Sequence, residues 1–172
     1  MPTTPTTYTF NTTAGQTVAR ELLVAYLNTG TDTQPVWSPI GKRVEDSSSE
    51  YDWSTETKRD ILGATYGTMK KPIITQAFEP CELDSGDTAQ KKIWDAAIVD
   101  QNPQALAAMD ILIAHLYASF GERYKSCMIE VTGEGGEGGG SIGLPINITY
   151  GGERIKGAVS ISSGTVTFTA ES

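Results

Sequence analysis

The last third of the chain alternates apolar and polar residues with a period of two, and this pattern constrains the fold more than any other feature. In residues 144–150, Leu144, Ile146, Ile148 and Tyr150 alternate with Pro145, Asn147 and Thr149. In residues 124–131, Lys125, Cys127, Ile129 and Val131 alternate with Tyr124, Ser126, Met128 and Glu130. Successive side chains of a strand point to opposite faces, so each segment predicts a strand with one core face and one polar face.

The same pattern continues to the end of the chain. Ile155, Val159 and Ile161, then Val166 and Phe168, are expected to point inward on two strands joined by a turn at Ser163-Gly164. Upstream, residues 20–28 carry apolar residues on both faces, which predicts a strand covered on both sides. Turn residues follow this segment, and Val36, Trp37 and Ile40 then predict the second strand of a hairpin.

A single helix is predicted from Asp87 to about Gln101. Ile93, Trp94, Ala97 and Ile98 form one apolar stripe at helical spacing, Ser85 or Asp87 is available as the N-cap, and Asn102-Pro103 ends the segment. Residues 111–117 fit a helix or a buried strand, and their context favours a strand. The sequence therefore predicts a mainly β fold, a two-sheet antiparallel sandwich or barrel with one flanking α-helix.

Two segments stand apart from this domain of residues 19–172. Residues 1–18 are rich in threonine and poor in apolar residues, which predicts a flexible arm. Residues 42–71 form a long, highly charged loop that nevertheless contains Tyr51, Trp53, Ile61, Leu62 and Tyr66. The loop is either plain exposed surface or a binding surface, and aromatic residues set among charges favour the second interpretation.

The residues needed for catalysis, metal binding or nucleic-acid binding are scarce. The single histidine, His115, lies in an apolar run and is expected to be structural. The glycine-rich segment from Gly133 to Gly140 lacks the GK[ST] ending of a phosphate-binding loop, and Cys81 and Cys127 are expected to be free thiols. A formal charge of -8 opposes DNA binding, and the chain contains no apolar run long enough to span a membrane. We therefore expect no enzyme activity, cofactor or metal, and no membrane insertion.

Two stretches of the sequence resemble a known family. Residues 19–58 contain a first strand ending in LNTGT, a tryptophan hairpin and a long polar loop ending in TETK, while residues 141–170 read SIGLPINITYGGERIKGAVSISSGTVTFTA. This order resembles the major tail tube proteins of long-tailed bacteriophages, and the predicted helix falls where that family places its own. The Ala-rich stretch from Gln104 to Ala108 and the length of the glycine-rich segment depart from the family pattern.

The resemblance implies a structural protein of the virion tail, assembled in the host bacterial cytoplasm. Six copies would form a ring whose inner sheets join into one continuous β-barrel, and stacked rings would form the tube through which phage DNA passes without specific binding. A tape measure protein and tail terminator or distal tail proteins are the implied partners. Contacts between subunits and rings would involve the long loop, with Tyr51 and Trp53 as packing anchors and Glu50, Lys58 and Arg59 as charged partners. The channel wall would include Glu130, Asn147 and Thr149, and its surplus of carboxylates would repel DNA.

Three other interpretations remain open on the sequence alone. A carbohydrate- or ligand-binding β-sandwich module would also have one domain and exposed aromatic residues such as Trp37 and Trp53. An enzyme on a β-scaffold fits poorly with one histidine and no catalytic motif. The inner tube of a contractile injection machine shares the family fold, and fold analogy does not separate it from a long-tailed phage.

Overall fold

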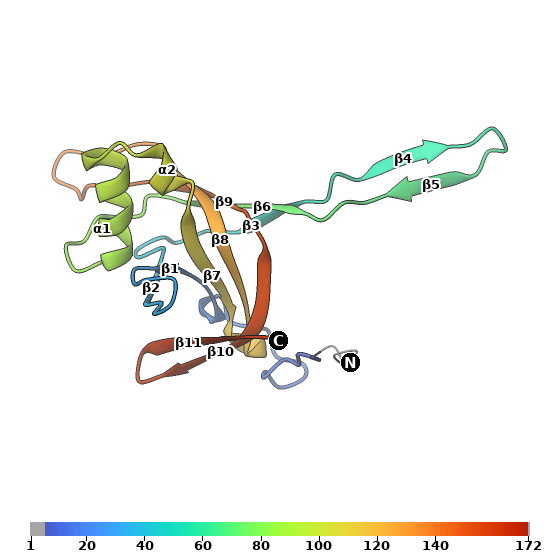
Figure 1. Ribbon diagram of the computed structural model, residues 1–172, viewed down its shortest axis with the longest axis horizontal. Coiled ribbons are helices and arrows are strands. Elements are labelled where there is room, and N and C mark those ends of the chain that lie inside the picture. Colours follow the sequence, from blue (N-terminus) through green and yellow to red (C-terminus); the bar gives the residue numbers. More distant parts are fainter. Residues whose placement is uncertain (1–5, 172) are drawn as a thin grey trace.

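The computed structural model describes residues 6–171, which form a mainly β fold (Figure 1). Nine strands join into one continuous sheet in the order β2-β1-β7-β8-β9-β6-β3, with β10 paired to β8 and β11 paired to β10. The strands are β1 (Leu23–Asn28), β2 (Trp37–Pro39), β3 (Ser49–Asp52), β6 (Ile73–Phe78), β7 (Met109–His115), β8 (Phe120–Val131), β9 (Ile146–Tyr150), β10 (Arg154–Ser162) and β11 (Thr165–Ala170). Two further strands, β4 (Glu56–Arg59) and β5 (Thr65–Thr68), form a separate hairpin.

Strand β8 connects two parts of the sheet because its two halves pair differently. Its first half pairs with β7 and β10, and its second half pairs with β9. We call β3, β6, β9 and the second half of β8 the smaller sheet. The larger sheet consists of β1, β2, β7, β10, β11 and the first half of β8. All pairs between strands are antiparallel, and the described residues do not close into a barrel within a single chain. The predicted antiparallel β fold is confirmed.

Two apolar clusters hold the sheet together. The main core contains Leu27, Ile111, Ile129, Ile146 and Ile148, together with Ile93 from the helix α1. The second cluster lies on the opposite face of β1 and β7, where Tyr26, Trp37, Leu112 and Ala114 pack against Val159 and Val166 of the β10-β11 hairpin. Strands β1 and β7 are therefore covered on both faces, as their two-sided apolar sequences predict.

The predicted helix is present and begins where the sequence indicates. Asp87 is the N-cap of α1 (Thr88–Trp94), and its side chain accepts a hydrogen bond from the backbone nitrogen of Gln90. The helix continues as the π-helical turn η2 (Asp95–Val99). Asn102 then caps a one-turn helix, α2 (Pro103–Leu106), which the sequence analysis did not predict. The 3₁₀ turns η1 (Arg20–Leu22) and η3 (Leu116–Ala118) complete the helical elements.

The predicted faces of β8 are right in its second half and wrong in its first. Cys127 and Ile129 are buried while Met128 and Glu130 are exposed, but Tyr124 is buried and Lys125 exposed, the reverse of the prediction. The register between β7 and β8 shifts here, since Met109 pairs with Cys127 and Ile111 pairs with Tyr124. The extra residue of this β-bulge on β8 reverses the direction of the preceding side chains.

The β10-β11 hairpin also differs in one detail. Ser163 and Gly164 both have positive φ angles, 49° and 79°, and form the predicted tight turn. Val159 and Val166 point inward as expected, but Ile161, the cross-strand partner of Val166, is 46% exposed.

The N-terminal arm lies partly outside the described residues, since residues 1–5 are not described. Tyr8 contacts the ring of Phe120, Phe10 contacts the ring of Tyr117, and Asn11 donates hydrogen bonds to backbone oxygens of η3. The flexibility expected for the arm stays a prediction. Among residues 6–171, no helix is long and apolar enough to cross a membrane.

Candidate assembly surfaces

The three residues predicted to line a channel lie together on one exposed face of the smaller sheet. Glu130 and Asn147 are direct cross-strand partners on β8 and β9, and Thr149 faces Thr75 of β6 in the next row. The opposite face of these strands carries Ile74, Phe78, Ile129, Ile146 and Ile148, which are buried in the main core. The structure thus brings together the residues that the alternation predicted, and their role as a channel wall remains a proposal.

Glu50 belongs to this face as well. It pairs with Thr75, which places it in the same cross-strand row as Thr149. Glu50, Thr75, Ala77, Glu130, Asn147 and Thr149 all border one shallow groove on this face. The segments 49–52, 73–78, 127–131 and 146–150 contain no lysine or arginine, so the charge that these strands contribute is purely negative. The sequence analysis assigned Glu50 to subunit contacts because it did not predict β3.

Tyr51 follows Glu50 on β3 and therefore points to the other face. Its ring stacks on that of Trp53, with centroids 6.3 Å apart and planes inclined by 18°. Both side chains are 45% exposed. A pair of large aromatic rings half-open to solvent is typical of surfaces that another protein covers.

Lys58 and Arg59 lie on β4, in a hairpin that projects far from the body (Figure 1). Every residue of β4 and β5 is exposed. Lys58 lies 4.0 Å from the carboxylate of Glu56 on the same strand, and Arg59 donates from Nε to the backbone oxygen of Gly63. The five residues predicted for subunit contacts therefore separate into Glu50 on the sheet face, the Tyr51–Trp53 pair at the hairpin base, and Lys58 and Arg59 on the hairpin.

The hairpin tip contains two residues that the sequence analysis noticed but did not select. Ile61 is 102% exposed and Leu62 is 88% exposed. The carboxylate of Asp60 accepts hydrogen bonds from the backbone nitrogens of Leu62 and Ala64, both at 2.9 Å. These bonds order the turn, so the two apolar side chains are held outward. The turn residues Asp60 and Gly63 on either side of Ile61-Leu62 are the sequence signal for such a tip.

The smaller sheet ends in two strand edges with unused hydrogen-bonding capacity. On one side, β3 pairs with β6 alone. On the other side, β8 pairs with β9 alone beyond Cys127, because β7 leaves β8 at Met109. Open edges of this kind accept a strand from another chain unless something covers them.

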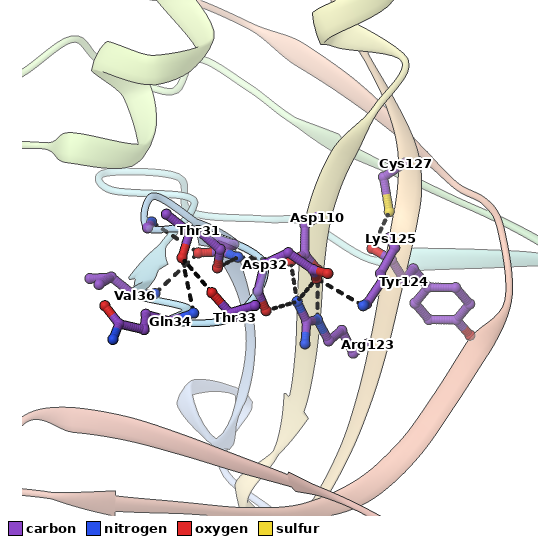
Figure 2. A network of polar contacts seen from close by, with 12 residues as sticks. Thr31, Asp32, Thr33, Gln34, Val36, Asp110, Arg123, Tyr124, Lys125 and Cys127 are labelled. Carbon is purple, nitrogen blue, oxygen red and sulfur yellow. Dashed lines mark hydrogen bonds and ion pairs between the residues drawn. The ribbon is translucent and has the colours of Figure 1, made fainter.

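Two polar clusters connect segments of the fold. Arg123 bridges Asp110 and Asp32, Lys125 contacts Asp32 at 2.8 Å, and together they fix the 29–36 turn to the sheet (Figure 2). Hydrogen bonding and charge from Lys125 hold the pKa of Asp32 below its ordinary value. The other cluster contains His115, whose Nδ1 lies 3.0 Å from the Tyr117 hydroxyl and whose Nε2 lies 3.5 Å from Glu122. His115 thus has hydrogen-bonding partners, in keeping with the structural role that the sequence analysis expected. Among residues 6–171, no cluster of side chains could hold a metal ion.

The cysteines agree with their prediction as well. Cys81 and Cys127 are free and buried. Burial raises the pKa of the Cys127 thiol to about 12 and also raises that of Cys81.

Comparisons with known proteins relate the fold to injection machines. No protein-family model and no curated protein sequence matches the chain. Among solved structures, a chain of the extracellular contractile injection system PVC, in its sheath-tube complex in the extended state, matches with a TM-score of 0.51 and 14% identity over 85% of this chain and 95% of that chain.

Two further solved structures match at the same low identity. A chain of the PVC sheath/tube terminator in the extended state matches with a TM-score of 0.51 and 14% identity, over 85% of this chain and 100% of that chain. A chain of the anti-feeding prophage cap, described as the AFP tube terminating cap, matches with a TM-score of 0.50 and 14% identity, over 94% of this chain and 96% of that chain. The chain therefore has a tail tube-like fold. These structures are not from long-tailed phages, so the specific tie to that family stays a prediction.

Proposed function

We propose that this chain is a structural tail protein that assembles with copies of itself into rings, which stack into the tube of a phage tail or tail-like injection machine. The proposal rests on the smaller sheet, which packs on the main core with one face, has a polar acidic face on the other side and has open edges at β3 and β8. Pairing the β3 edge of one copy with the β8 edge of the next would satisfy both edges and continue around a closed ring.

In this arrangement the acidic face becomes the channel wall. The side chains at Glu50, Thr75, Ala77, Asn147, Thr149 and Glu130 are short or negatively charged, and their strands carry no basic residue that would bind phosphate. DNA would pass through without specific binding, because carboxylates repel its backbone. The proposal also includes hexameric rings, delivery of DNA, a tape measure protein inside the tube, and terminator or distal proteins at its ends.

Electron microscopy of the purified chain over a range of concentrations tests the proposal. Rings or hollow tubes should appear as concentration rises, because closed association is a mass-action process. Light scattering should show a parallel increase in particle mass above 18.4 kDa. If the protein stays monomeric at every concentration and salt condition, the proposed function is wrong.

A second candidate is a component of a contractile machine, either its inner tube or a ring that ends the tube. It is favoured by the origin of the three similar structures, which are the PVC sheath-tube complex, the PVC terminator and the AFP cap. A tube protein should form long stacks, whereas a terminating ring should stop at one layer. Immunolabelling of intact particles with an antibody to the chain then distinguishes two kinds of tail. In a contractile tail the sheath covers the tube, so the antibody binds only after the sheath is removed or contracted. In a flexible tail without a sheath, the antibody binds the intact particle.

A further inference from the structure

We propose that the two open edges of the smaller sheet repel each other between copies of this chain, so that screening of their carboxylates by salt controls when copies join into a ring. The repelling groups are Glu50 and Asp52 on β3 of one copy and Glu130 on β8 of the next. This inference rests on the proposed function, in which the two edges pair, and adds the condition that regulates their pairing.

The carboxylates at these edges have no basic neighbour. Glu50, Asp52 and Glu130 are exposed, and within residues 6–171 none of them forms an ion pair. Several other carboxylates at the surface are paired, as in Lys42–Asp84, Arg43–Glu82 and Lys91–Asp95. Charged side chains on an open strand edge oppose pairing with another chain. The three carboxylates therefore protect the open edges of a monomer.

The two edges meet in antiparallel directions. Three antiparallel pairings lead from β8 through β9 and β6 to β3, so β3 runs opposite to β8 within one chain. Rotation about a ring axis keeps the direction of each strand along that axis, and β3 of one copy is therefore antiparallel to β8 of the next. Directly opposite side chains on one face of an antiparallel pair have Cβ atoms about 5 Å apart. Carboxylates that meet across this seam between copies are thus close neighbours.

Every register that joins these edges over two or more residues brings carboxylates together. The edges are Ser49–Asp52 on β3 and residues 128–131 on β8, and both strands must share the exposed face, which restricts the register to steps of two. In the fully overlapping register, Glu50 lies opposite Glu130. A shift of two residues in one direction places Asp52 opposite Glu130, and a shift in the other direction places Glu50 diagonally across from Glu130.

Salt screens this repulsion because all three carboxylates are exposed to solvent. The Debye length is about 30 Å at 0.01 M salt and about 3 Å at 1 M, so charges about 5 Å apart repel each other at the first concentration and are largely screened at the second. Like charges directly opposite each other destabilise a strand pair, and their removal corresponds to about a two- to fivefold lower threshold concentration for assembly.

The first test measures this threshold by light scattering at about 0.01 M and about 1 M NaCl. Wild-type protein should need a higher concentration at low salt. Glu130→Gln keeps the size of the side chain and removes the charge that all three registers share, so its threshold at low salt should be about two- to fivefold lower and should depend less on salt. A wild-type threshold that is equal at both salt concentrations, in samples that form tubes, overturns this inference and leaves the proposed function intact.

The second test exchanges the charges across the seam. Glu130→Lys alone, or Glu50→Lys with Asp52→Lys, places opposite charges on the two edges, so each variant should assemble at a lower concentration than wild type at low salt. Combining all three substitutions makes the charges alike again, and the threshold should return toward that of wild type. A combined variant that assembles more readily than either parent would mean that these residues do not face each other. Circular dichroism checks that each variant is folded, and Glu50→Gln with Asp52→Asn replaces the lysine pair if it folds poorly.

The control is Glu137→Lys. Glu137 is an exposed carboxylate in the glycine-rich segment, outside the four strands of the smaller sheet, and its replacement changes the net charge as Glu130→Lys does. Its threshold should stay close to that of wild type, and a threshold as low as that of Glu130→Lys would assign the effect to net charge and overturn the inference. Wild-type protein and variants that all remain monomeric at every concentration and salt overturn the proposed function itself. The two failures are therefore distinguishable.

Discussion

The thiol reactivity of Cys127 is determined by its surroundings. It lies between the two halves of β8 at the β-bulge, is fully buried, and donates its thiol to the backbone oxygen of Tyr124. The thiolate is the reactive form of cysteine, and burial in apolar surroundings disfavours it. We predict that a thiol reagent at pH 8 labels neither Cys127 nor Cys81 in the native protein, and that both are labelled after unfolding in guanidinium chloride. Rapid labelling of the native chain would contradict the buried positions.

Glu122 is the most deeply buried carboxylate with described partners, at 5% exposure. Burial by itself raises its pKa, but hydrogen bonds from His115 and Arg154 and the charge of Arg154 outweigh burial, and the pKa of Glu122 lies below its ordinary value. Arg154 donates from Nε at 2.6 Å, and Tyr124 and Tyr51 are the other titratable groups nearby. The ion pair therefore stabilises the fold at pH values above the ordinary glutamate pKa, and this contribution is lost as pH falls through the lowered pKa.

Glu122→Gln tests this contribution. The variant keeps the size of the side chain and removes its charge, so we expect the free energy of unfolding to fall by about 2 kcal/mol at pH 7, a value moderated by the half-exposed Arg154. The difference from wild type should shrink as pH decreases below 4.5, the ordinary value for glutamate. Urea unfolding at several pH values measures it. Glu130→Gln, an exposed carboxylate on the same strand, is the control and should change stability little at any pH.

At the level of elements, the sequence predicted side-chain directions most accurately in strands that have one continuously buried face. The alternation in β9 is correct at every position, and Asp87 is the N-cap that the pattern indicated. The first half of β8 failed because a β-bulge depends on the partner strand and leaves no mark in the alternation of β8 itself. Strands β4 and β5 were missed for another reason. Both faces of each strand are exposed, so there is no apolar alternation for a pattern to detect.

The hairpin base supplies a prediction at this scale. Trp53 is not part of the main core, and its ring stacks on Tyr51 at the edge of β3. Trp53→Ala should therefore leave a folded monomer while weakening assembly, because truncating an aromatic anchor at an interface typically costs on the order of 2 kcal/mol. Circular dichroism checks the fold, and light scattering measures the concentration at which assembly begins.

The matched control for this variant is Ile161→Ala. Ile161 is 46% exposed, an exposed fraction similar to the 45% of Trp53, but it lies on the β10-β11 hairpin away from β3. Assembly of the Ile161 variant should match wild type. Normal tube formation by the Trp53 variant would instead assign the Tyr51–Trp53 pair to plain solvent-exposed surface.

At the scale of the whole molecule, the sequence predicted a common face for three residues but not its extent. Glu130, Asn147 and Thr149 were placed together by alternation alone, and the structure confirms that they share a face. The membership of Glu50 depends on the pairing of β3 with β6, a contact between segments separated by the hairpin. A groove between the short helices and β8, which Leu106 and Met128 line, depends on how α2 lies beside β8. Such non-local arrangements come from tertiary packing, which local patterns do not encode.

The last prediction concerns the exposed face of the smaller sheet as a channel wall. Glu130→Lys, Asn147→Lys and Thr149→Lys in one chain would place three lysines in adjacent rows of this face and change none of the buried residues behind it. Tubes should still form. Short double-stranded DNA should now bind to them, since passing phosphates would lie within a Debye length of the new charges, about 8 Å at physiological salt. Binding should weaken steeply as salt rises, because it depends on counterion release.

A control variant must show that DNA binding depends on where the lysines lie, and not only on their added charge. Thr165, Thr167 and Thr169 are exposed on one face of β11, and their joint replacement by lysine adds three basic residues at a site outside the smaller sheet. DNA that is protected from nuclease in tubes of the first triple variant, and not in tubes of the β11 variant, places the first three positions inside the channel. Intact tubes of the first variant that bind no more DNA than wild type would mean that these residues face elsewhere. Another face would then form the wall, because lysines beside a channel of DNA dimensions cannot be electrostatically silent at low salt.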